Sequence, residues 1–75
     1  MTGLTHTQQG IMHYLRTYIK DVGYPPSVQE IADGVKLRSK SSVLYQLRTL
    51  EALGHIRRDH NRPRGLVILA EEATP

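Results

Sequence analysis

Basic side chains gather in one stretch of this sequence. Between positions 36 and 64 there are eight lysine and arginine residues against two acidic residues, Glu51 and Asp59, whereas the segments on either side carry a slight excess of acidic residues. Guanidinium and ammonium groups bind phosphate oxygens, so this asymmetry indicates a polyanion as the partner. The net charge of the whole chain is only +3, and a solvated basic surface explains the charge alone equally well.

The residues offer little for catalysis or metal binding. The sequence has no cysteine, and His6, His13, His55 and His60 lack the spacing of a metalloprotease or zinc-finger motif. The segment Ser39-Lys40-Ser41 combines hydroxyls with an amine, but nothing around it predicts a pocket that would turn the lysine into a base. We therefore expect no enzyme, no metal site and no cofactor.

A first helix is predicted over residues 5–21. Thr5 and Gln8 have the types and spacing of a capping box, and apolar residues then recur at helical spacing as far as Val22. Gly23 is expected to end this helix, because glycine adopts a left-handed backbone without a Cβ clash.

Two further helices are predicted with a tight turn between them. Ser27 and Glu30 form a second capping box, and this short helix is expected to end within 34–36. The next helix is expected from Ser39 or Lys40 to Gly54. Its inward face is predicted to consist of Val43, Leu47 and Leu50.

The remaining sequence predicts a β-hairpin. Residues 55–58 and 65–69 are β-prone, and residues 59–62 have turn chemistry. The predicted fold is therefore mainly α with a small β part: a three-helix winged helix-turn-helix with a C-terminal hairpin as the wing. Residues 1–70 would form this single domain, and residues 71–75 a disordered tail.

This order of elements indicates binding to double-stranded DNA. In a helix-turn-helix the last helix enters the major groove N-terminus first, and a basic wing can lie against phosphates. Leu44 could touch thymine methyls, Tyr45 a base edge or a phosphate, and Arg48 the backbone. The predicted DNA-binding residues are Lys36, Arg38, Ser39, Lys40, Ser41, Ser42, Leu44, Tyr45, Arg48, Arg57, Arg58, Arg62 and Arg64.

Several of these residues have a second interpretation. Ser39 fits a helix cap as well as it fits a DNA contact, and Leu44 also fits the core. Arg57 and Arg58 alternate along a strand, so one of them could face a helix instead of DNA. The tyrosines outside the basic stretch fit packing better than nucleobase stacking: Tyr14, Tyr18 and Tyr24.

Residues 4 to about 69 resemble the LexA family, which represses the bacterial DNA-damage (SOS) response, and most closely its actinobacterial and other Gram-positive members. The resemblance is carried by Gly23-Tyr24-Pro25-Pro26-Ser27, by Glu30-Ile31-Ala32, by Gln46-Leu47-Arg48-Thr49-Leu50-Glu51 and by Gly54-His55-Ile56-Arg57-Arg58-Asp59. It implies a repressor that reads a palindromic operator as a dimer, with a wing that grips the DNA backbone. It also implies a base-reading face made of Ser39, Ser41, Ser42, Leu44 and Tyr45.

The sequence departs from the family in three ways. Leu44 and Tyr45 are not typical at their positions, so the preferred base sequence could differ. Lys36 stands where a glycine is usual, and a left-handed lysine would cost about 1 kcal/mol. LexA proteins also carry a C-terminal domain that dimerises and cleaves itself with a serine-lysine pair, whereas this chain ends at Pro75.

The expected function is that of a cytoplasmic, nucleoid-associated transcriptional regulator that binds double-stranded DNA, with a second copy on a palindromic site. The alternative is a winged-helix module that pairs with or modulates another regulator through protein contacts.

Overall fold

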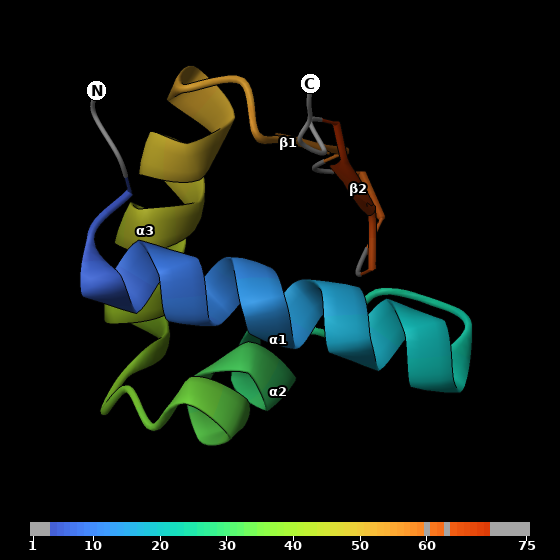
Figure 1. Cartoon of the computed structure of the whole chain (residues 1–75), viewed down its shortest axis with the longest axis horizontal. Coiled ribbons are helices and arrows are strands. Elements are labelled where there is room, and N and C mark those ends of the chain that lie inside the picture. The colour runs from blue at the N-terminus through green and yellow to red at the C-terminus, as the bar shows by residue number, and fades with distance from the viewer. Residues whose placement is uncertain (1–3, 60, 63, 70–75) are drawn as a thin grey trace.

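The computed structural model describes residues 4–59, 61–62 and 64–69. Its elements are α1 (His6–Val22), α2 (Val28–Val35), α3 (Lys40–Ala52), β1 (Ile56–Arg58) and β2 (Leu66–Ile68). Figure 1 shows α1 crossing the molecule, with α2 beneath it, α3 near its N-terminal end and the hairpin on the other side. This arrangement confirms the predicted winged helix-turn-helix. The predicted tail and His60 lie outside the described residues.

The ends of α1 follow the predicted capping chemistry. The Gln8 backbone N–H donates to Thr5 Oγ1 at 3.1 Å, and the Thr5 N–H donates to Gln8 Oε1 at 3.0 Å. Gly23 has a φ of 97° and donates its N–H to the Ile19 carbonyl at 2.8 Å. The capping box and the C-terminal glycine thus set the helix to within one residue of the predicted bounds.

The turn between α2 and α3 contains a strained residue. Lys36 is the C-cap of α2, with φ 61° and ψ 38°. A side chain in this left-handed region costs about 1 kcal/mol, which glycine would avoid. The cost noted for a lysine here did not change the turn: Lys36 adopts the left-handed conformation that a glycine would take.

The predicted hairpin is present, but its strands are shorter and its connection is longer than expected. β1 and β2 are antiparallel, with three residues each and with Ile56 opposite Ile68. The Asp59 N–H donates to the Gly65 carbonyl at 2.6 Å and the Leu69 N–H to the His55 carbonyl at 2.9 Å, so hydrogen bonds join the two arms beyond both ends of the strands. The third helix also ends two residues before the predicted Gly54, whose φ of 87° turns the chain into β1.

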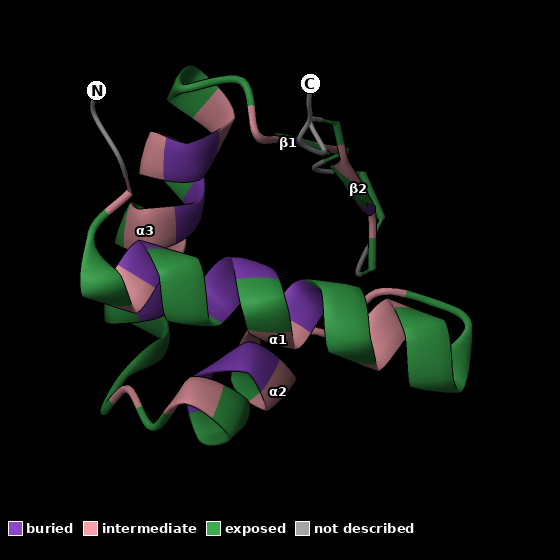
Figure 2. Ribbon diagram, viewed as in Figure 1, coloured by how far each residue is buried: buried purple, intermediate pink, exposed green. Residues whose placement is uncertain are grey.

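One small apolar core joins the helices and the hairpin. Each of the three helices carries buried residues, drawn in purple in Figure 2. The predicted inward residues of α3 belong to this core, and each strand adds one side chain to it. The core consists of Ile11, Met12, Leu15, Ile31, Ala32, Val43, Leu47, Leu50, Ile56 and Leu66.

One polar side chain is buried with the core. Gln8 is only 7% exposed, and its Nε2 donates to Gln46 Oε1 at 3.2 Å. The Oε1 of Gln8 also accepts the Thr5 N–H at the start of α1. Both the oxygen and the nitrogen of the buried carboxamide therefore have hydrogen-bond partners. The hydrogen bond to Gln46 joins α1 to α3.

No helix within the described residues is long and apolar enough to span a bilayer.

α1 and α2 approach each other most closely where α2 has a glycine. A Cβ at Gly34 would overlap the ring of Tyr14. That ring in turn packs on Tyr18, with 5.8 Å between the ring centroids. Gly10, in contrast, has nothing within 4 Å of its Cβ position. The two glycines therefore form a matched pair, one close-packed and one open.

We expect Gly34→Ala to lower the free energy of unfolding by about 1–3 kcal/mol, because the Tyr14 ring must move. Gly10→Ala should raise it by about 0.5–1 kcal/mol, since alanine favours a helix over glycine. Urea denaturation of both variants checks this. An equal gain for both would show that Tyr14 moves away without cost.

Candidate nucleic-acid interface

The turn before α3 and the first turn of α3 expose a group of basic side chains. Lys36, Arg38 and Lys40 are all exposed. Ser39 is the N-cap, and its Oγ accepts the Ser42 N–H at 3.2 Å while lying 3.3 Å from Ser42 Oγ. The capping interpretation of Ser39 therefore holds, and the start of α3 is an ordered, positively charged helix N-terminus.

One face of α3 is turned away from the core. Ser41, Leu44, Tyr45 and Arg48 line a shallow hollow of about 240 Å³ on this face. The Tyr45 side chain is 66% exposed, the largest exposure among the large apolar side chains described. Leu44 is half-buried and lies outside the core cluster. This face carries methyl groups, hydroxyls and one guanidinium.

The wing presents its arginines in different directions. Arg57 is exposed and lies opposite Val67 in the hairpin, whereas Arg58 is half-buried on the same side of β1 as the core residue Ile56. The expectation that one of the two faces the helices thus holds for Arg58. Arg62 is largely exposed, and its Nε lies 3.5 Å from Asp59 Oδ2. An exposed ion pair of this kind is weak.

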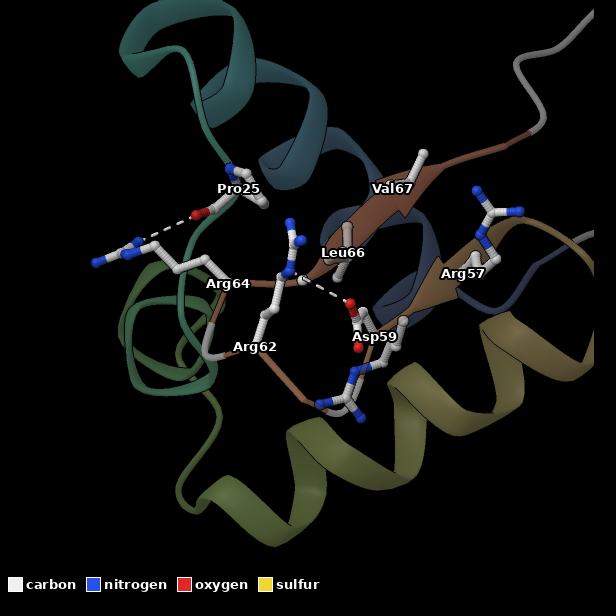
Figure 3. Close-up of a pocket in the computed structure, with 9 residues that line it drawn as sticks. Pro25, Arg57, Asp59, Arg62, Arg64, Leu66 and Val67 are labelled. Carbon is white, nitrogen blue, oxygen red and sulfur yellow. Dashed lines mark hydrogen bonds and ion pairs between the residues drawn. The ribbon is translucent and has the colours of Figure 1, made fainter.

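These arginines surround a hollow on the described surface. It has a volume of about 520 Å³ and lies between the hairpin and the connector from α1 to α2 (Figure 3). Asp59 is the one acidic residue in its lining. The other lining residues are Pro25, Arg57, Arg58, Arg62, Arg64, Gly65, Leu66 and Val67.

Arg64 differs from the other predicted contacts because both of its terminal nitrogens bind a carboxylate on another element. Its two terminal nitrogens lie 2.7 and 3.2 Å from the two carboxylate oxygens of Glu30. It also donates to the Pro25 carbonyl at 3.0 Å, as Figure 3 shows. Its guanidinium carbon lies 4.9 Å from the centre of the Tyr24 ring, within the range of a cation–π interaction.

The electrostatics of this pair follow from the hydrogen bonds. The Arg64 guanidinium, followed by the Ser27 backbone N–H, lowers the pKa of Glu30 to about 2. The same contact raises the pKa of Arg64 above its usual value. Desolvation and a hydrogen bond to Glu30 raise the pKa of Tyr18, whose hydroxyl donates to Glu30 Oε1 at 3.1 Å. Both members of the ion pair are therefore charged at neutral pH.

The sequence did not reveal the partners of Arg64. Tyr18 and Tyr24 were assigned to packing and Glu30 to a helix cap, and both assignments hold. Their additional role depends on a contact between positions 34 residues apart, for which no local periodicity gives a signal. Among the described residues, no three His, Asp or Glu side chains cluster so as to hold a metal ion.

A short helix, a tight turn, an exposed face on the next helix and a basic hairpin together define a winged helix-turn-helix DNA-binding domain. Residues 1–65 match the family model of the LexA DNA binding domain. The chain belongs to this family, which confirms the resemblance and the prediction of a DNA-binding domain.

Full-length relatives agree with this assignment. The chain is 51% identical to the LexA repressor of Mycobacterium ulcerans, with 97% of this chain and 30% of that protein aligned. It is 53% identical to the LexA repressor of Mycobacterium sp. strain KMS, over 97% of this chain and 33% of that protein. For Mycolicibacterium smegmatis the identity is 50%, over 93% and 29%. The chain thus spans about 30% of the length of these relatives.

The lowered pKa of Glu30 predicts a contribution to stability that depends on pH. In the unfolded chain this carboxyl titrates near its ordinary value of about 4.3, whereas in the folded chain its pKa is about 2. The ion pair should therefore stabilise the fold fully above about pH 5 and lose its effect as the pH falls toward 2. Urea unfolding of the parent chain and of Glu30→Gln should give a difference that shrinks over this range. A difference independent of pH would contradict the ion pair.

Proposed function

We propose that this chain is the operator-reading domain of a LexA-type transcriptional repressor, and that it binds a palindromic SOS-type operator with two copies. The observation that carries the proposal is the outward face of α3, formed by Ser41, Leu44, Tyr45 and Arg48 and adjoined by three basic side chains. The names of the relatives, which are LexA repressors, support the repressor role.

Base recognition would come from the outward face of α3. The N-terminal turns of the helix would lie in the major groove. Leu44 offers methyl groups to thymine C5-methyls, and the hydroxyls of Ser41 and Tyr45 can donate to or accept from base edges. Arg48 lies further along the helix and would bind the backbone.

Phosphate binding would come from both ends of the interface. Lys36, Arg38 and Lys40 would contact the backbone beside the major groove. The wing would add Arg57 and Arg62, with Arg58 at the inner edge of the hollow. Such contacts supply affinity without sequence preference and release counterions, so binding should weaken as salt increases.

A second copy would complete the site. One domain covers one half-site, and two domains held together on a palindrome gain affinity through their effective concentration. A regulator of this kind would act on the chromosome in the bacterial cytoplasm, where occupancy of a promoter blocks transcription.

The test is fluorescence anisotropy with a labelled SOS-type palindrome and a scrambled duplex, each at two salt concentrations. We expect the palindrome to bind at least about tenfold more tightly, which corresponds to roughly 1.4 kcal/mol. Equal, weak binding of both duplexes would contradict sequence reading by this domain alone. Binding to neither would favour a protein-interaction module.

Substitutions in the two parts of the interface should have separable effects. Tyr45→Ala with Leu44→Ala should reduce the preference for the palindrome and leave binding to the scrambled duplex nearly unchanged. Arg57→Ala or Arg62→Ala should weaken both, and should reduce the slope of log affinity against log salt by about 0.9 per lost phosphate contact. Lys20→Ala is the control that should change neither, because Lys20 lies in the last turn of α1, and Figure 1 shows that end of α1 away from α3. If the wing variants bind like this control, the wing assignment is wrong.

A further inference from the structure

The wing is tied to the helices by a carboxylate on α2. Arg64 lies just before β2, and both of its terminal nitrogens are bonded to Glu30. A two-pronged contact of this kind fixes direction as well as distance, because the guanidinium plane must align with the carboxylate. The pair is only moderately exposed, at 39% for Arg64 and 37% for Glu30. The contact joins the wing loop to α2 across 34 residues of sequence.

Glu30 collects hydrogen bonds from three different parts of the chain. Its Oε1 accepts from the Tyr18 hydroxyl of α1 at 3.1 Å, from the Ser27 N–H before α2 at 2.8 Å and from Arg64 at 2.7 Å. Arg64 adds the carbonyl of Pro25 and the ring of Tyr24. The end of α1, the connector and α2 thus together surround the guanidinium with hydrogen-bond acceptors and an aromatic ring.

Apart from Arg64, the wing makes few directional contacts with the helices. Each strand has three residues, and one residue of each strand, Ile56 and Leu66, enters the core. Apolar contacts of this type hold the hairpin close but tolerate rotation, because they are not directional. The loop hydrogen bonds from Asp59 to Gly65 lie within the hairpin. Ile68 also packs against the core, and the His55 N–H donates to the Leu50 carbonyl just before β1. Among the described residues, Arg64 makes the side-chain hydrogen bonds that join the wing to α2 and to the connector, so its contact limits rotation of the wing about its base.

We infer that Glu30 and Arg64 are positioning residues for DNA binding: their ion pair sets the orientation of the wing relative to α3, so that Arg57 and Arg62 meet the phosphates. This inference rests on the proposed function, in which the wing contacts DNA. It removes Arg64 from the phosphate contacts expected from the sequence. It also gives an acidic residue a favourable effect on binding to a polyanion.

The inference makes an unusual prediction about charge. Removing a carboxylate near a DNA-binding surface normally strengthens binding, because repulsion of phosphates is lost. Glu30→Gln should instead weaken binding to the palindrome by about fivefold, the scale expected of an exposed ion pair. Glutamine keeps an oxygen for the Ser27 N–H, so the cap of α2 survives. Asp33→Asn removes the same charge from the exposed side of α2 and should leave affinity unchanged or slightly higher.

Arg64→Gln separates a positioning role from a phosphate contact. We expect it to weaken binding by the same factor as Glu30→Gln, because DNA must then bring an unoriented wing into place at a cost in free energy. The slope of log affinity against log salt should stay unchanged, because Arg57 and Arg62 make the same phosphate contacts once the wing is in place. The double variant should be no weaker than either single variant, because both remove one interaction. A direct phosphate contact would reduce the slope by about 0.9, as for Arg62→Gln, and Glu30→Gln would then bind more tightly. Either result would overturn the inference.

A measurement without DNA tests the inference independently of the proposed function. Residual dipolar couplings of backbone amides report the orientation of β1 and β2 relative to α3. In the parent chain the hairpin and α3 should fit one alignment frame, whereas in Glu30→Gln and Arg64→Gln the hairpin should depart from the frame of the helices. An unchanged orientation in both variants would refute the positioning role. If the parent chain binds no duplex, the proposed function fails, and these couplings still decide whether the pair orients the wing.

Discussion

The core determines which side of α3 can face DNA. Val43, Leu47 and Leu50 are buried, and they fix the rotation of the helix about its own axis. A turn of α3 about this axis would bring polar groups into a core of ten apolar side chains, where burial without a hydrogen bond is costly. The face with Ser41 and Tyr45 is therefore exposed because the opposite face is fully used for packing. In a domain of this size, packing and recognition compete for the same short helix.

Apolar packing alone does not fix how the elements are oriented toward each other, and directional polar contacts between elements supply that information. The hydrogen bond from Gln8 to Gln46 joins α1 to α3, and the ion pair of Glu30 with Arg64 joins α2 to the wing. Each contact has directional geometry that an apolar contact lacks. Both contacts also use residues that cap helices, since Gln8 and Glu30 are the third residues of their capping boxes. In each case one side chain caps the N-terminus of a helix and also attaches that helix to a neighbouring element.

Features with a local cause could be predicted from the sequence. The capping boxes, the glycine after α1 and the inward residues of α3 depend on neighbours within a few positions, so residue types and spacing were sufficient. The contacts of Arg64 could not be predicted, because its partners come from three segments that meet only after folding. The strands are shorter than predicted, although single hydrogen bonds from Asp59 to Gly65 and from Leu69 to His55 join the residues next to them.

The wing has consequences for how the domain loses structure. A two-stranded hairpin with three residues in each strand is not stable by itself in water, so it stays folded only while it is docked on the helical body. It should therefore open as a cooperative unit at a lower free energy than the helices, whose amides would remain protected from hydrogen exchange. An intermediate with intact helices and an undocked hairpin would still present α3. The domain would thus keep α3 in position for the major groove while the wing, which is its second contact with DNA, is temporarily undocked.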